Sequence, residues 1–107
     1  MRLWMAGALL WPGVVWAEAW EQLTGEQIAE ALSARVVVFP EGVAQDFRAD
    51  GRTIRAGAWG EWRVEGDRYC EVWVNSRPIC AAVDRQGITL RFREETGFVR
   101  LGRYGDL

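Results

Sequence analysis

The sequence predicts a mainly β domain, with one short N-terminal helix and about eight antiparallel strands in a meander that forms a small up-and-down barrel or a curled sheet. Half of the 107 residues are apolar, which is a globular composition. A helix-start motif precedes one apolar stretch near residue 24, and from residue 35 onward short apolar stretches alternate with turn residues. This length allows a single domain.

The first nineteen residues have the pattern of a secretion signal. Arg2 gives a positive start, 3–16 is uncharged and mostly apolar, and residues 17–19 (AEA) fit the small-x-small cleavage rule. As a helix, the apolar stretch would span about 21 Å, which is too short for a hydrocarbon core of about 30 Å. We expect cleavage after Ala19, or after Ala17, leaving a periplasmic or secreted domain of residues 20–107 without stable membrane insertion.

The two cysteines of the chain, Cys70 and Cys80, agree with export. In an exported chain an even pair of cysteines is most simply a disulfide, which would stabilise the fold by about 3 kcal/mol. A metal site or a catalytic thiol is the alternative, but the chain has no His to complete either one. The sequence therefore predicts a Cys70–Cys80 disulfide, with no metal and no cofactor.

The helix is predicted to begin at a capping box. The Thr24 hydroxyl can accept from the amide of Gln27, while the Gln27 side chain reaches back to the amide of Thr24. The apolar residues that follow recur with helical spacing, so a helix of about ten residues should end at Ser33 or Ala34. It is too short to be stable alone and must pack on an apolar surface.

The remaining elements are predicted from apolar alternation between turns. Asp50-Gly51 is a two-residue hairpin signal that places Phe47 opposite Ile54. A loop at 85–87 would place Cys80 opposite Phe92, and a loop at 94–97 would place Phe92 opposite Val99. The predicted strands are 35–39, 43–49, 52–56, 59–65, 68–74 and 79–84, followed by two that flank the loop at 94–97.

Within 68–74, alternation assigns Cys70 to the apolar face, so that both cysteines lie on the core side. Trp59 and Trp62 are expected in the core. Aromatic and Arg side chains remain on the outward positions, and interface hot spots use such groups. The alternative is that these rings cover one another or lie under the helix. The candidate binding face consists of Tyr69, Trp73, Arg63, Arg91, Arg93 and Arg100.

Catalysis is disfavoured because the chain contains neither His nor Lys, so no Ser or Thr has an obvious base to activate it. Carboxylate pairs can also act as acid and base. The candidates are Glu61 with Glu65 and Glu94 with Glu95, which we expect on a solvated outer face or a loop tip. A formal net charge of −2 provides no basic field for nucleic acid. We therefore expect neither an enzyme nor a nucleic-acid partner. A carboxylate-based hydrolase is the third function hypothesis, after the two binding roles given below.

Several segments follow a recurring pattern: 23–28 reads LTGEQI and precedes Leu32, 50–53 reads DGRT, 60–70 reads GEWRVEGDRYC, and Cys80 is the later cysteine. With these segments the chain resembles a group of small secreted bacterial domains of unknown function. Those domains begin with LTG-E-I and carry a DG-T hairpin and a G-W-V-GD-C segment before a second Cys. The resemblance covers most of residues 23–104. It implies an exported, disulfide-bonded β domain and supplies no activity.

A weaker resemblance, on residues 87–90 (GITL), is to periplasmic inhibitors of metalloproteases or lysozyme, which are single-disulfide eight-stranded barrels. We expect a non-enzymatic module that binds a protein or a cell-envelope ligand. The alternative is a periplasmic protease or lysozyme inhibitor that acts through a terminus or an exposed loop, with 75–78 as the favoured loop.

Overall fold

The computed structural model describes residues 19–107, so the predicted secretion signal lies, except for Ala19, outside the described residues. None of the helices in the described part is long and apolar enough to span a membrane. The elements are β1 (Glu21–Gln22), α1 (Gly25–Leu32), β2 (Arg35–Val38), β3 (Ala44–Phe47), β4 (Arg52–Arg55), β5 (Ala58–Glu65), β6 (Arg68–Trp73), β7 (Ile79–Gln86), β8 (Thr89–Glu94) and β9 (Val99–Tyr104).

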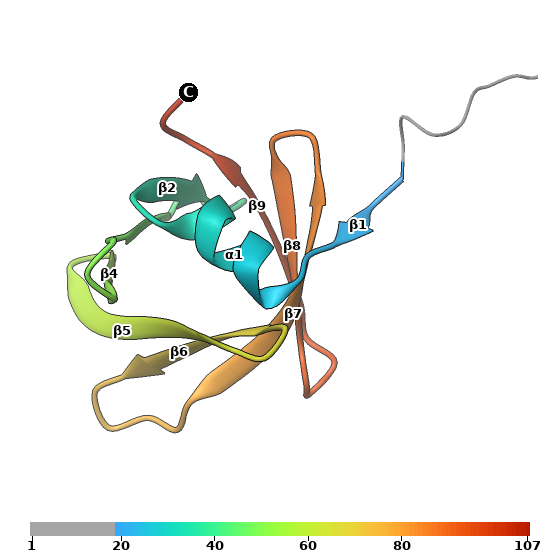
Figure 1. Ribbon diagram of the computed structural model, residues 1–107. Coiled ribbons are helices and arrows are strands. Elements are labelled where there is room, and N and C mark those ends of the chain that lie inside the picture. Colours follow the sequence, from blue (N-terminus) through green and yellow to red (C-terminus); the bar gives the residue numbers. More distant parts are fainter. Residues whose placement is uncertain (1–18) are drawn as a thin grey trace, which may run out of the picture.

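Strands β2 to β9 form a closed antiparallel barrel (Figure 1). Each strand pairs with its neighbour in sequence, and the pairing of β2 with β9 closes the wall through Val37 opposite Tyr104 and Val38 opposite Arg103. The short strand β1 lies outside this circle and pairs with the second half of β7. The predicted mainly β meander is thus confirmed, and it is closed as a barrel.

Helix α1 covers one end of the barrel, which we call the closed end. The predicted capping box is present: Gln27 N–H donates to Thr24 Oγ1 (3.3 Å), and Thr24 N–H donates to Gln27 Oε1 (2.8 Å). The buried face of α1 includes Ile28 and Leu32, both with no exposed surface. Tyr104 at the end of β9 donates its hydroxyl hydrogen to the carbonyl of Ala31 (2.7 Å), so the helix is joined to the wall.

The core beneath α1 is built around four aromatic rings. Phe47, Trp62, Tyr69 and Phe92 form a chain of contacts with ring centroids 5.4–6.4 Å apart, several of them edge to face. Trp62 is therefore in the core, as predicted. Trp59 is not, because 47% of it is exposed at the start of β5.

Three of the predicted strand registers are wrong. Phe47 lies opposite Thr53 rather than Ile54, Val83 rather than Cys80 lies opposite Phe92, and Arg93 rather than Phe92 lies opposite Val99. The loop lengths explain each shift. In the β3–β4 and β8–β9 hairpins, Gly51 (φ 92°) and Gly97 (φ 98°) each follow a turn as the third loop residue. The β7–β8 connection has two residues rather than three.

The change in the β7–β8 register reverses the face predicted for Cys80, and the faces of the paired strand β6 are reversed with it. Tyr69 is buried inside the barrel with 1% of its surface exposed. Cys70 and Cys80 lie directly opposite each other on β6 and β7, on the face that points away from Tyr69. The cysteines therefore do not share the core face, contrary to the prediction, because a shift of an odd number of residues turns every side chain of a strand to the other face.

Candidate ligand-binding site at the mouth of the barrel

The six residues of the predicted binding face do not form one surface. Tyr69, Trp73 and Arg100 belong to a hydrogen-bonded and ion-paired network around the buried Glu71 inside the barrel. The other three belong to the outer wall, where Arg63 pairs with Glu65 while Arg91 and Arg93 pair with Asp84. The prediction of a single outward face is therefore wrong, and the inward group becomes the better candidate for a site.

The outer arginines have a structural role next to β1. Arg91 Nε and Arg93 Nε each lie 2.7 Å from Asp84 Oδ2, and Arg93 Nη2 also donates to Gln22 (3.2 Å). Burial alone would raise the pKa of Asp84, but the hydrogen bonds and charges of both arginines outweigh it and lower that pKa. The guanidinium of Arg91 also lies 4.4 Å from the ring of Trp20. These contacts hold the N-terminal strand against β7.

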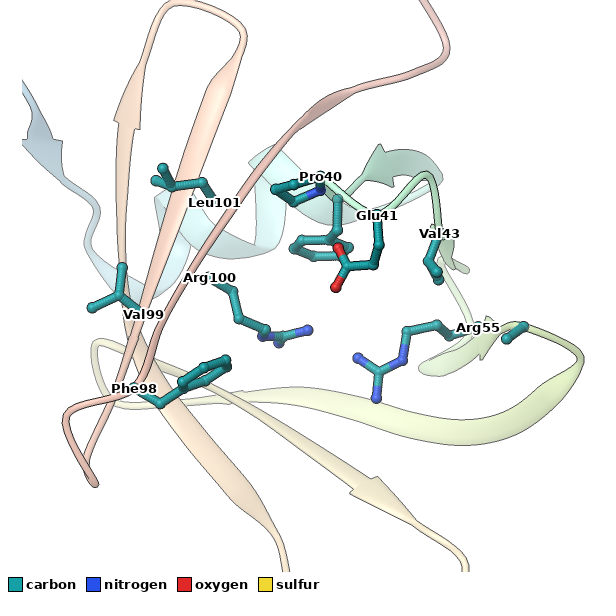
Figure 2. A pocket seen from close by; sticks show the side chains of 10 residues that line it. Pro40, Glu41, Val43, Arg55, Phe98, Val99, Arg100 and Leu101 are labelled. Carbon is teal, nitrogen blue, oxygen red and sulfur yellow. The ribbon is translucent and has the colours of Figure 1, made fainter.

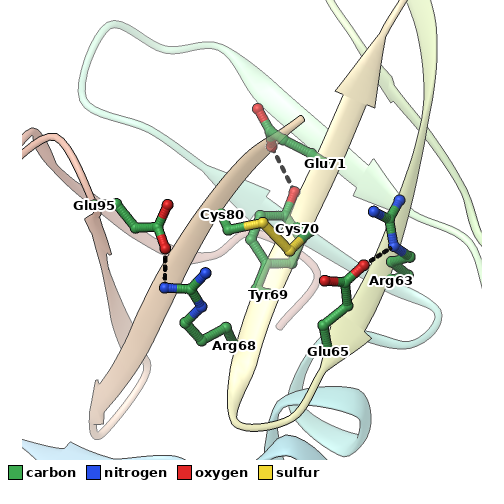
Figure 3. The surroundings of a disulfide bond; sticks show 8 residues. All are labelled: Arg63, Glu65, Arg68, Tyr69, Cys70, Glu71, Cys80 and Glu95. Atoms are coloured by element: carbon green, nitrogen blue, oxygen red, sulfur yellow. Dashed lines mark hydrogen bonds and ion pairs between the residues drawn. A yellow bond between two sulfur atoms is a disulfide. The ribbon is translucent and has the colours of Figure 1, made fainter. Parts of the chain in front are cut away.

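The disulfide lies on the outer wall between two ion pairs (Figure 3). The sulfurs of Cys70 and Cys80 are 2.10 Å apart, which agrees with the predicted pairing. Arg68 pairs with Glu95 on one side of it, and Glu65 lies on the other. A carboxylate oxygen of Glu65 lies within 4.8 Å of both sulfurs. The disulfide consumes both thiolates, so this group offers a metal ion one carboxylate and no thiolate.

Inside the barrel, the centre of the polar network is Glu71, which has 1% of its surface exposed. Its carboxylate accepts hydrogen bonds from the Tyr69 hydroxyl (2.5 Å) and from Trp73 Nε1–H (2.8 Å). Two guanidinium groups complete the shell, with Arg100 Nη2 at 3.4 Å from one oxygen and Arg55 Nη1 at 3.7 Å from the other. A buried carboxylate is costly unless it is paired and hydrogen-bonded, and this one is both.

The amide of Gln45 extends the network to the opposite wall. Gln45 is fully buried, and its Nε2–H donates to Thr53 Oγ1 (3.0 Å), while Arg55 Nη1–H donates to its Oε1 (3.3 Å). Because Gln45 and Thr53 come from β3 and β4 and Glu71 comes from β6, the polar groups of three strands meet in the interior. The network therefore depends on the curvature of the sheet, which brings these side chains together in the interior.

The same contacts shift two pKa values in opposite directions. Burial favours the neutral form of Glu71, but hydrogen bonds from Trp73 and Tyr69 and the charges of the two arginines outweigh it and lower the pKa of Glu71. Burial, followed by the charge of Glu71, raises the pKa of Tyr69 well above its ordinary value. Around neutral pH the network therefore holds an ionised Glu71 beside a protonated Tyr69.

A pocket of about 730 Å³ opens above this network, at the end of the barrel opposite α1, which we call the mouth (Figure 2). Arg55 and Arg100 extend their guanidinium groups into it from facing sides, and Phe98 lies beside Arg100. The pocket lies where β2 and β9 separate, because their pairing ends at Val38 and Arg103. Its lining residues are Phe39, Pro40, Glu41, Val43, Arg55, Ala56, Phe98, Val99, Arg100 and Leu101.

The predicted carboxylate pairs do not meet in this pocket. Glu61 and Glu65 are exposed on β5, as expected, and Glu95 is exposed in the loop. Glu94 is different, because its side chain is only 14% exposed and its Oε2 lies 3.6 Å from Arg100 Nε. The loop at 75–78, named above for an inhibitor, is exposed throughout.

Sequence reasoning missed Glu71, Arg55 and Gln45 as site residues. Each lies in a short strand that also has polar residues on its outer face, and the alternation of β6 equally allows Tyr69, Glu71 and Trp73 to share one face. The face with Tyr69 and Trp73 carries two aromatic side chains, and this is the sequence signal that could have indicated that the face is buried. Comparison of the chain with protein families, with curated proteins and with solved structures finds no match.

Proposed function

We propose that the protein is an exported, non-enzymatic binding module whose ligand occupies the pocket at the mouth of the barrel. The observation that carries the proposal is a pocket of about 730 Å³ directly above a buried network of charged groups. Buried ion pairs are a poor way to stabilise a small core. Polar groups gathered at the base of a largely apolar pocket are typical of small-molecule sites.

Export is supported by the disulfide. Such bonds persist in oxidising compartments, and Cys70 and Cys80 lie at bonding distance. The apolar segment at 3–16 supports the same reading.

A binding role is favoured over catalysis by the state of Glu71. A general acid or base works best when its pKa lies near the working pH. The partners of Glu71 instead lower its pKa, and they occupy both carboxylate oxygens. Such a carboxylate is a weak base that serves best to hold the two arginines in place.

Titration with Nile red, a neutral apolar dye, tests the pocket. We expect the dye to bind the wild-type protein with increased fluorescence, and Phe98→Ala to weaken binding about tenfold, because this ring is exposed in the pocket wall. The control is Ile88→Ala, which removes an exposed apolar side chain outside the pocket lining. No dye binding, or equal weakening by both variants, would refute the proposal.

An inhibitor of a periplasmic protease or lysozyme is the second candidate. It is favoured by the run of exposed residues at 74–78, where Val74 has 80% of its surface exposed and Cys80 anchors the strand that follows. Inhibition assays with a lysozyme and a metalloprotease test it. If the mouth pocket is the functional site, neither enzyme loses activity at equimolar protein.

A further inference from the structure

We infer that the ligand of the mouth pocket is an amphipathic organic monoanion, whose carboxylate is held between Arg55 and Arg100 and whose apolar part lies against Phe98. This inference rests on the proposed function and specifies its ligand class. It is argued from the unused hydrogen-bond donors of the two arginines, from the apolar wall and from the balance of charge around the pocket.

Arg55 keeps donors that its protein partners do not use. Its Nη1 donates to Gln45 and faces Glu71, whereas the hydrogen bonds of the described residues include none from its Nε or Nη2. Its guanidinium lies 4.6 Å from the ring of Trp73, which fixes the orientation of the group. Its side chain is 30% exposed and lines the pocket, so a ligand there can reach the guanidinium group.

Arg100 lies deeper and carries an unsatisfied donor. Its Nε is buried and has no hydrogen bond within residues 19–107, since the carboxylate of Glu94 lies 3.6 Å away, beyond normal hydrogen-bond length. Its guanidinium is 4.8 Å from the ring of Phe39, which also lines the pocket. A buried donor without a partner costs free energy that an acceptor on a ligand can recover by small side-chain movements.

The rest of the wall fits an apolar tail. Phe98, Val99 and Leu101 line the pocket, and between 44% and 58% of each residue is exposed. Apolar side chains grouped at this exposure are unusual on a small protein unless they contact a partner. Val99 and Leu101 alternate with Arg100 along β9 and point away from it (Figure 2), so a carboxylate on the arginines would direct the tail of the ligand along Phe98.

The charge balance around the pocket disfavours a dianion. Glu71 and Glu94 formally neutralise the two arginines, and Glu41 adds a carboxylate at the rim (Figure 2). The pocket therefore has no surplus positive charge for a dianion such as a phosphate monoester. A single carboxylate can be bound by N–H donors that point toward it, and guanidinium groups supply such donors for charge-assisted hydrogen bonds.

The experiment is displacement of Nile red by four compounds that share one alkyl chain: octanoate, octanol, octylamine and octyl phosphate. We expect octanoate to displace the dye at concentrations at least about tenfold lower than octanol, which corresponds to one charge-assisted hydrogen bond. Arg55→Gln should remove that advantage and leave octanol unchanged. Arg63→Gln, on the outer wall, is the matched control and should leave both unchanged. Thermal unfolding of each variant verifies that it is folded.

The outcomes separate the inference from the proposed function. If octanol displaces the dye as well as octanoate does, the pocket binds ligands but the carboxylate assignment is wrong. Tighter binding of octylamine or octyl phosphate, or an octanoate advantage that persists in folded Arg55→Gln, also overturns the assignment. If Nile red itself does not bind, the proposed function fails first.

Discussion

At the closed end of the barrel, α1 places Ile28 and Leu32 on an apolar core and leaves neither side chain exposed, whereas at the mouth the interior is occupied by Glu71, Arg55 and Arg100 beneath an open pocket. The same strands run through both ends. The difference shows that this barrel does not repeat one packing solution along its axis. One end excludes water by hydrophobic packing, and the other keeps charge in place by pairing it. Departures from ordinary core chemistry are expected at functional sites.

The largest predicted effect is a loss of stability when the polar network at the mouth is disrupted. Glu71→Ala should lower the free energy of unfolding by about 4 kcal/mol, because it leaves Arg55 and Arg100 without their shared carboxylate in a partly buried setting. Urea denaturation monitored by Trp fluorescence measures the loss. Glu61→Ala on the exposed face of β5 is the control and should change stability very little. A loss for Glu71→Ala as small as that of the control would mean that the network is not a stabilising unit.

The next largest effect is a loss of stability when the apolar packing at the closed end is disrupted. Ile28→Ala should cost about 3 kcal/mol, since it removes a fully buried side chain and leaves a cavity under α1. The difference between the two ends predicts that the folded variant keeps wild-type affinity for Nile red, because Ile28 does not line the mouth pocket. Denaturation and dye titration on the same sample test both parts. A large loss of dye affinity would show that the two ends are coupled.

A smaller effect is expected from pH. The folded-state pKa of Glu71 is lowered from its ordinary value of 4.5, so the unfolded chain takes up this proton at a higher pH than the folded protein does. The stabilisation is therefore fully present above about pH 5 and is lost as the pH falls through the folded pKa. Urea denaturation at about pH 7 and about pH 4 should show a greater loss of stability on acidification for the wild type than for Glu71→Gln. Equal losses would assign the acid sensitivity to other groups, such as Asp84.

The smallest effect sharpens the chemistry of the mouth. Glu41→Gln should strengthen octanoate binding about twofold to threefold, because it removes a like charge from the rim of the pocket, where screening by solvent keeps the interaction weak. Octanol binding should not change, which separates the charge effect from a change of shape. Weaker octanoate binding in this variant would place the carboxylate elsewhere.

Much of the fold could be predicted, because the signals are local. The capping box at Thr24 and the apolar alternation along β5 depend on residues within a few positions, and both are found. The predicted registers were wrong where the loop length was misjudged. Gly51 closes a three-residue loop, whereas Asp50-Gly51 alone indicates two, and the other two loops are each one residue shorter than predicted. The site could not be predicted, because Glu71 is tolerated inside only through arginines from β4 and β9. Their proximity follows from barrel closure and from no local pattern.

The closure of the wall has a consequence for motion. Every pairing around the barrel joins strands that are adjacent in sequence except that of β2 with β9, which spans most of the chain and is held through short stretches at Val37–Val38 and 103–105. A contact of such high sequence separation is formed late during folding, because closing the intervening chain costs entropy. We expect the same junction to be the first part of the wall to separate in brief local openings. Amide hydrogen exchange should then be faster at Gly105, whose N–H donates to Val36 across the junction, than in the pairing of β5 with β6. Since the pocket adjoins this junction, such openings would set the largest compound that can enter.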